Sequence, residues 1–366
     1  MPKPPKSKDR LLPIRHPQRE LFICDIADAV LKSDMASMAH PIFALSKQPD
    51  LNIREYRHGD VKLTVTPSVR GLATIYDKDI LIFAISQIMA ARKEGRRTSR
   101  QLILSARSFL VFTNRNTGGG DYEQLEQALH RLTGTRLHTT IATGGETQDS
   151  WFGLLEQAEV VRQGGDGRIK YLKLVLSEWL YNAIEANEVL TMHPDYFRLR
   201  KPLERRIYEI ARKHCGQQPL WVIGLELLHK KSGSASPLRQ FRYLVKEIAE
   251  ENVLPDYLIA YDGEKDQVRF VARSRAELLI ADQQAPQLKP ETYVRAERIL
   301  GHWDPHETEQ LWRDWLDMSD LPPPADPDAS YLAFCQRWIT KKEPGRQAME
   351  AKTDDVVARL AAKLRV

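Results

Sequence analysis

One order of predicted elements occurs twice along this chain, and it restricts the possible folds more than any other feature. Residues from about 70 to 176 have the patterns of a helix, a short strand, two further helices and then hairpins. Residues from about 200 to 275 repeat that order and end in a single hairpin. The two segments share the pattern but no close residue identity. Because three helices followed by a hairpin are typical of the winged helix-turn-helix domain, the sequence predicts two such domains in tandem.

Helix signals define the first segment. Asp77 to Lys93 has apolar residues at three- and four-residue spacing, and Ser105 to Phe112 is typical of a short helix. Asp121 can cap a third helix, which stops at Gly134. The last of the strand-like runs that follow is Ile169 to Leu176.

The second segment begins with a helix from Lys201 to His214, started by Pro202. Trp221 to Lys230 is either a second short helix or a strand that runs into one. Two β-rich runs then flank a four-residue turn that contains glycine, which predicts a hairpin between residues 257 and 273.

The third helix of the second segment, residues 236–251, has a reversed distribution of charge. Ser236 can cap it, and Pro237 suits its first position. Its cations lie in the first turns, whereas its acids lie only in the last turns. The helix macrodipole favours the opposite order by about 0.3–1 kcal/mol per charge, so helix stability does not explain the pattern. Entry of the first turns into a DNA major groove would explain it. The apolar face consists of Leu238, Phe241, Leu244, Val245 and Ile248.

This helix therefore carries the candidate DNA-reading residues. Arg239 and Gln240 are the expected base readers, because Arg pairs with guanine and Gln with adenine in the major groove. Arg242 is assigned to the same group, although its place near the apolar edge also suits a bracing role. The expected phosphate contacts around this helix are Ser236, Tyr243 and Lys246.

Further phosphate contacts are expected outside this helix. Arg205 and Arg206 lie on the first helix of the second segment, which often crosses the DNA backbone in this fold. An ion pair between Arg205 and Glu209 is the alternative. In the first segment, dimerisation or domain packing is an equal alternative to DNA contact. The remaining candidates are Lys265 and Arg269 in the second hairpin, and Arg115, Arg131 and Arg136 in the first segment.

Composition excludes several classes of protein. The chain has 366 residues, 42% of them hydrophobic, and a net charge of +5. Its three cysteines lie far apart, so we expect no disulfide framework, no metal site and a reducing compartment. No apolar run reaches membrane-spanning length and the N-terminus lacks an apolar signal core, so we expect a cytoplasmic protein without membrane contact.

Motifs for catalysis are missing from the sequence. It has no Gly-x-x-x-x-Gly-Lys-Ser/Thr run that would cradle nucleotide phosphates. It also lacks the His-hydrophobic-His element with which rolling-circle initiators hold the metal for their tyrosine nucleophile. We therefore expect no enzymatic activity and no cofactor.

Residues 197–216 read FRLRKPLERRIYEIARKHCG, and they are followed by the runs Arg239 to Arg242 and Leu254 to Tyr257. These stretches resemble the plasmid replication initiator protein A family. Residues between Leu125 and Arg136 resemble the step from helix to strand in the first winged-helix domain of these initiators. The resemblance extends from about Leu12 to Arg273.

This resemblance implies a bacterial plasmid initiator. Such a protein binds repeated sites in double-stranded origin DNA, helps to melt an AT-rich region, and recruits host replication initiator and helicase proteins. Initiators of this type often also repress their own promoter as homodimers, which contributes to control of plasmid copy number.

The expected fold is therefore α+β and mostly helical, with tandem winged helix-turn-helix domains and a small C-terminal helical module. The expected function is replication initiation at a plasmid origin; a winged-helix transcriptional regulator and a rolling-circle DNA nickase are the alternatives. The aromatic residues of the C-terminal module either form its core or dock a host protein. The expected divisions are a disordered basic tail at 1–18, a first winged-helix domain with an N-terminal extension at 19–196, a second, DNA-reading domain at 197–276, a linker at 277–290, the helical module at 291–345 and a charged tail at 346–366.

Overall fold

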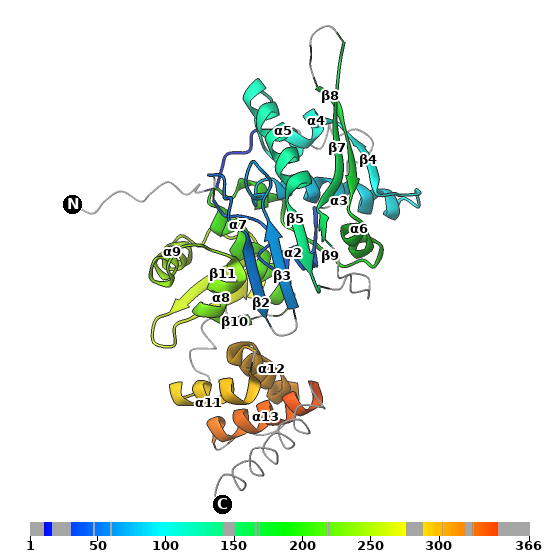
Figure 1. Ribbon diagram of the computed structural model, residues 1–366. Coiled ribbons are helices and arrows are strands. Elements are labelled where there is room, and N and C mark those ends of the chain that lie inside the picture. Colours follow the sequence, from blue (N-terminus) through cyan, green and yellow to red (C-terminus); the bar gives the residue numbers. More distant parts are fainter. Residues whose placement is uncertain are drawn as a thin grey trace, which may run out of the picture.

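The computed structural model describes residues 11–16, 31–46, 48–58, 61–141, 151–164, 167, 169–216, 218, 220–275, 288–301, 303–318, 324 and 326–342. The expected charged tail lies outside these ranges, as do most of the expected basic tail and most of the expected linker. The domain boundaries stay predictions. Figure 1 shows three parts: the first winged-helix unit above, the second in the middle, and the C-terminal helices below.

The first winged-helix unit follows the predicted order. Ser105 caps its second helix by accepting a hydrogen bond from the Ser108 N–H at 3.2 Å. Asp121 does not cap the third helix, because that helix begins earlier, with Gly118 at its N-cap. The three strands form an antiparallel sheet in the order β4-β8-β7. The elements are α3 (Lys78–Lys93), β4 (Gln101–Leu104), α4 (Ala106–Phe112), α5 (Gly119–Gly134), β7 (Leu155–Arg162) and β8 (Ile169–Leu176).

The second winged-helix unit has the same topology. Its sheet has the order β10-β12-β11, so the first strand again pairs with the last strand of the hairpin. The segment from Trp221 to Lys230 is a strand that runs into a helix, which was one of its two predicted forms. The tandem winged-helix prediction is thus confirmed. The elements are α7 (Pro202–His214), β10 (Leu220–Gly224), α8 (Leu225–Ser232), α9 (Leu238–Glu251), β11 (Tyr257–Asp262) and β12 (Gln267–Ala272).

Additional strands and short helices join the two units. One sheet has the order β2-β3-β5-β6, and a smaller one pairs β1 with β9, far apart in sequence. The elements are β1 (Lys32–Asp34), α2 (Met35–Ala39), β2 (Arg54–His58), β3 (Val61–Thr66), β5 (Arg136–Thr139), β6 (Trp151–Gly153), α6 (Glu178–Glu185), β9 (Val189–Thr191) and the 3-10 helices η1 (Pro194–Arg198) and η2 (Arg273–Arg275).

A single hydrophobic cluster continues through both winged-helix units. Helix α3 lies inside it: Ile82 and Phe83 are buried although they fall outside the apolar face that the sequence pattern indicates. The ring centroids of Phe83 and Phe112 are 4.9 Å apart, and Phe112 in turn meets Phe197 of η1 at 5.7 Å. This chain of aromatic contacts links the first unit to the residues that lead into the second.

The turn between α8 and α9 is held by the N-terminal elements. Gly233 ends α8 with a φ of +69°, and a Cβ on it would lie 2.5 Å from Cβ of Pro41, so no other residue fits without a shift. Arg54 of β2 donates from Nη1 to the Gly233 carbonyl oxygen at 3.1 Å, while its Nη2 pairs with Asp50 at 2.6 Å. Pro41 on one side and Arg54 on the other therefore hold the turn that leads into α9.

The C-terminal helices α11 (Pro290–Leu300), α12 (Pro305–Met318) and α13 (Pro327–Lys342) have a hydrophobic core of their own. Trp312 is buried in it, with its ring 5.7 Å from that of Tyr331, whereas Trp315 remains 38% exposed. Helix α12 lies against β10 of the second unit (Figure 1). Within the described part of the chain, no helix is long and apolar enough to cross a membrane.

Candidate nucleic-acid interface

Helix α9 has one buried face and one face in solvent. Phe241, Val245 and Ile248 are buried in the common core. Arg239 and Gln240 are exposed in the first turn. The exposed face continues along the helix with Tyr243, which is 67% exposed, and with Lys246. The predicted separation of the two faces is confirmed, since Arg239 and Gln240 extend from a buried scaffold into solvent.

The start of α9 differs from the prediction. The helix begins at Leu238, Pro237 occupies the N-cap position, and no side chain makes a capping hydrogen bond there. Ser236, the predicted cap, shares a hydrogen bond of 2.8 Å with the Ser234 hydroxyl. Its carbonyl oxygen lies 2.9 Å from Nε2 of His229 on α8, so the residue helps to shape the turn. Its predicted phosphate contact stays a prediction.

Arg242 is engaged with the turn of the β11-β12 hairpin. Its Nε and Nη2 donate to the two carboxylate oxygens of Asp266 at 2.9 and 2.7 Å. These hydrogen bonds raise the pKa of Arg242 and lower that of Asp266. The Tyr261 hydroxyl also donates to Asp266, at 2.6 Å. The geometry favours the bracing role for Arg242, since base reading would require this bidentate pair to break.

The acidic rear half of α9 is compensated from the second unit's first helix. Lys201 lies at the start of α7 and places its Nζ 3.0 Å from Glu247 and 3.5 Å from Glu251. Partial burial opposes its charge, but the carboxylates outweigh it and raise the pKa of Lys201. Lys246 lies on the other side of this acidic end, 4.9 Å above the ring of Tyr261. Arg239 and Lys246 are thus the cations of α9 that lie on its exposed face.

The hairpin supplies less positive charge than predicted. Nη2 of Arg269 pairs with Asp262 at 2.9 Å, and its side chain is only 14% exposed. Arg269 lies opposite Val222 of β10, in the sheet against which α12 packs. This placement leaves Arg269 little surface for a phosphate. Lys265 is half-buried in the turn itself.

Arg205 and Arg206 are buried, which contradicts their predicted contact with DNA phosphates. Arg205 donates from Nη1 to both carboxylate oxygens of Asp79, at 2.8 and 3.1 Å. Burial opposes its charge, but Asp79 outweighs it and raises the pKa of Arg205. Nη1 of Arg206 donates to the carbonyl oxygens of Ser37 and Met38 at 3.0 and 2.9 Å. Both guanidinium groups instead join segments of the core.

The alternative pair between Arg205 and Glu209 is also not formed. Glu209 accepts from Nη1 of Arg206 at 3.3 Å and pairs with Nζ of Lys78 at 2.8 Å, with both partners of the latter pair fully buried. Because Lys78 and Asp79 lie on α3 and their partners on α7, two buried ion pairs join the first helices of the two units.

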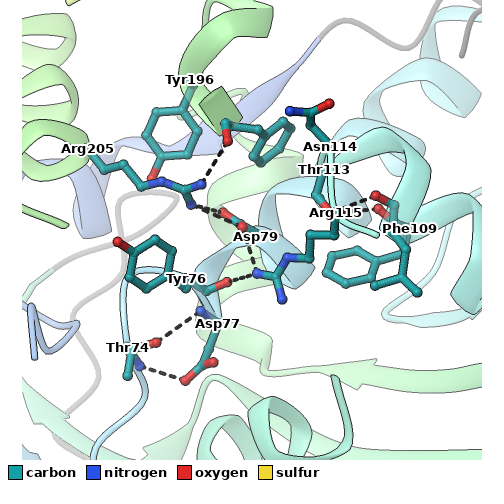
Figure 2. Close-up of polar contacts among 12 residues, drawn as sticks. Thr74, Tyr76, Asp77, Asp79, Phe109, Thr113, Asn114, Arg115, Tyr196 and Arg205 are labelled. Carbon is teal, nitrogen blue, oxygen red and sulfur yellow. Dashed lines mark hydrogen bonds and ion pairs between the residues drawn. The ribbon is translucent and has the colours of Figure 1, made fainter. Parts of the chain in front are cut away.

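Arg115 and Arg131 are paired with acids of the first unit. Figure 2 shows the pair of Arg115 with Asp79. Arg115 donates from Nη2 to Asp79 at 2.8 Å, so Asp79 holds two arginines. Arg131 makes a bidentate pair with Asp77, at 2.7 and 2.8 Å. Both arginines are about one-fifth exposed. Of the three predicted cations in the first unit, only Arg136 is exposed, with Nη2 3.1 Å from the Trp151 carbonyl oxygen.

Sequence reasoning missed two exposed arginines beside α5. Arg70 donates from Nη1 to Oε1 of Gln127 at 2.7 Å. Arg200 directly precedes the helix that carries the buried arginines, and its carbonyl oxygen accepts from the Tyr76 hydroxyl at 2.7 Å. Arg200 belongs to a basic run that the sequence shows, but nothing local distinguishes it from Arg205. Among the described residues, no group of three or more His, Cys, Asp or Glu side chains could hold a metal ion.

Comparison with known sequences places this chain in a family. The chain belongs to the replication initiator protein A family, whose sequence profile matches residues 32–259. A relative from Wigglesworthia glossinidia brevipalpis, named "Putative replication protein", is 38% identical over 259 residues, which is 70% of this chain and 94% of that protein.

Two crystal structures of domains 2 and 3 of RctB have a similar arrangement of elements. They give TM-scores of 0.48 and 0.45 at 13% identity, and each comparison covers 65% of this chain and 97% of the other.

Proposed function

We propose that this chain initiates plasmid replication by binding repeated sites in double-stranded origin DNA. The observation that carries the proposal is the exposed face of α9, where Arg239 and Gln240 extend from the first turn of a helix that is anchored on its other face. In helix-turn-helix proteins, residues at this end of the corresponding helix contact base edges in the major groove. Membership of a replication initiator family supplies the biological setting.

The contacts and the exposure of its side chains support a division of roles within α9. Arg239 and Gln240 read bases, Tyr243 and Lys246 contact phosphates, and Arg242 holds the hairpin turn against the helix through Asp266. Since Lys201 compensates the acids at the rear of α9, their repulsion of DNA is reduced. The bound DNA would thus meet the front of α9.

Protection mapping on DNA that flanks the protein's own gene tests this proposal. Repeated protected sites beside an AT-rich tract would support an initiator. One palindromic operator without such repeats would support the winged-helix transcriptional regulator instead. Replication of a test plasmid that depends on both the chain and the protected sites would then complete the assignment.

The proposal includes recruitment of host initiator and helicase proteins, repression of the protein's own promoter, and a homodimer in the repressing form. It includes no catalysis. Incubation of a supercoiled origin plasmid with the protein and Mg²⁺ tests that part: accumulation of nicked circles would support the rolling-circle nickase, and their absence would support an initiator that acts by binding.

A further inference from the structure

A cavity of about 760 Å³ lies between the first winged-helix unit and the residues that lead into the second. Gln124 and Gln127 of α5 line one side. Arg70 lines it from the loop before α3, and Arg200 lines it next to the start of α7. The cavity thus adjoins α5, the third helix of the first unit, which has the same place in its unit as α9 in the second.

The lining of this cavity is positively charged. It contains six arginines and three aspartates, a surplus of three positive charges. The aspartates do not offer free negative charge equally: Asp77 is bound by Arg131, and Asp79 is bound by both Arg115 and Arg205. Figure 2 shows the pairs that Asp79 makes with Arg115 and Arg205. Asp79 and its two arginines keep one positive charge of this surplus, and Arg15, Arg70 and Arg200 supply the other two once the charge of Asp121 is subtracted.

Arg70 and Arg200 are exposed, so their positive charges are accessible to a ligand in the cavity. Arg70 is exposed and donates to Gln127, which is neutral, so this contact does not compensate the charge of Arg70. Arg200 is exposed, and among the described residues its guanidinium makes no ion pair. The main chain of Arg200 is fixed on both sides, because its N–H donates to Glu204 at 3.2 Å and its carbonyl oxygen accepts from Tyr76 at 2.7 Å. The two guanidinium groups are thus presented from an ordered scaffold.

We propose that this cavity binds a phosphate group of the DNA backbone, with Arg70 and Arg200 as its ligands. The inference rests on the proposed function. Lys201, the neighbour of Arg200, pairs with Glu247 of α9, so the part of the cavity that Arg200 lines is close to α9. A backbone that passes from one third helix to the other would cross it. Guanidinium groups suit phosphate oxygens because they donate in a fixed, planar fork.

The test is DNA binding by the full-length chain with the double substitution Arg70→Ala and Arg200→Ala. The slope of log K against log salt should become shallower by about one, because both arginines contact the same phosphate and one lost phosphate contact removes about one. Discrimination between origin and scrambled DNA should stay as in the wild type. The matched control is Arg298→Ala, an exposed arginine on α11, which should leave the slope unchanged. Replacement of Arg70 and Arg200 by Lys should restore most of the slope.

A scan with single methylphosphonates places the contact on the DNA. One neutral linkage between the segments that α5 and α9 cover should weaken wild-type binding about tenfold and have no further effect on the double Ala variant. An unchanged salt slope in that variant, or equal sensitivity of both proteins to the neutral linkage, would overturn the inference.

Equilibrium dialysis of the DNA-free protein with labelled pyrophosphate distinguishes a free phosphorylated ligand. If the wild type binds pyrophosphate, the double Ala variant does not, and both have the same salt slope, the site serves a small ligand and the backbone assignment is wrong. Failure of the proposed function would give a different result, namely that the wild-type chain shows no preference for origin DNA over scrambled DNA.

Discussion

Asp266 binds Arg242 through both carboxylate oxygens, with donor distances of 2.9 Å from Nε and 2.7 Å from Nη2. The pair joins the hairpin turn to α9, although the two residues are 24 positions apart in sequence. Its position is reinforced locally, because the Asp266 carbonyl oxygen accepts from the Leu225 N–H of α8 at 2.9 Å. One residue thus holds together the second helix, the third helix and the hairpin.

Asp266→Asn should release Arg242 to the DNA-facing side. An amide cannot match the charge-assisted bidentate pair, so Arg242 would gain freedom to contact phosphates of any sequence. We expect stronger binding to scrambled DNA, a salt slope steeper by about one and a lower specificity ratio. The free energy of unfolding should fall by only about 0.2–1 kcal/mol, because the pair is partly exposed. Fluorescence titrations on both DNAs over a salt series measure this.

Asp262→Asn is the control for that experiment. It makes the same charge change in the same hairpin but loosens Arg269, which is mostly buried. If both variants changed scrambled-DNA binding equally, the effect would come from overall charge, and the specific role of Asp266 would be refuted.

Arg239→Ala and Lys246→Ala should weaken origin binding in different ways. Loss of a bidentate contact to guanine should cost about 1–3 kcal/mol of specific affinity and relax the preference at one base position. Loss of Lys246 should weaken cognate and scrambled DNA alike and reduce the salt slope by about one. Binding to a library with each base position randomised measures both. A uniform loss in Arg239→Ala would exclude base reading by that residue.

Local pattern was sufficient to predict the elements and the exposed face of α9. The spacing of Phe241, Val245 and Ile248 places Arg239 on the opposite side and Gln240 on its flank, whatever the rest of the chain does. The same holds for the order of elements in each unit, since each helix and strand depends mainly on its own residues. Arg239 and Gln240 are therefore the part of the candidate site that can be predicted from the sequence.

Whether the other arginines are buried or exposed depends on partners that are distant in the sequence. Arg205 lies 126 positions from Asp79, and Arg206 lies 169 positions from the Ser37 carbonyl that it binds. A basic run such as residues 198–213 has the same appearance whether its charges are buried or solvated. The prediction failed for Arg205 and Arg206 because their partners come from α3 and α2.

Breaking the buried pair between Asp79 and Arg205 should destabilise the whole chain. Asp79→Ala would leave Arg205 without its carboxylate in a site where only 4% of its surface is exposed, and Arg115 would lose the same partner. Removal of one member of a buried pair costs about 3–5 kcal/mol. Urea denaturation measures the change, and Arg239→Ala, at an exposed position, should stay within about 0.5 kcal/mol of wild type.

A double substitution separates burial of charge from loss of packing. Asp79→Leu combined with Arg205→Met should recover part of the stability lost in Asp79→Ala, because apolar groups of similar volume need no compensation. Equal loss in the single and double variants would mean that the shape of the pair, not its charge, stabilises the junction between the units.

The stability of the junction at α12 should depend on pH through Asp304. Burial, and then the nearby Glu307 carboxylate, raise the pKa of Asp304 to about 7. In the unfolded chain an Asp has a pKa of about 4, so the folded protein binds this proton more tightly, and the stabilisation falls as pH rises from about 4 to about 7. Asp304→Asn cannot ionise, and its amide oxygen can still accept the His306 N–H, which now lies 3.0 Å from Oδ1. The variant should therefore gain stability relative to wild type over that range.

Denaturation of both proteins at several pH values measures this difference and cancels the contributions of other groups. Those contributions are real, since burial lowers the pKa of His214 and takes that of His306 to about 4, which destabilises the folded chain as pH falls below about 6.5. Asp328→Asn is the control in the same helical module. The pKa of Asp328 is lowered by hydrogen bonds from Thr292 and Lys289 that outweigh its burial, so its variant should lose stability relative to wild type, or stay level, across the same range. If Asp304→Asn behaved like Asp328→Asn, the Asp304 carboxyl would be ionised in the folded protein, and α12 would dock through an ordinary charge pair with Lys231 rather than through a protonated acid.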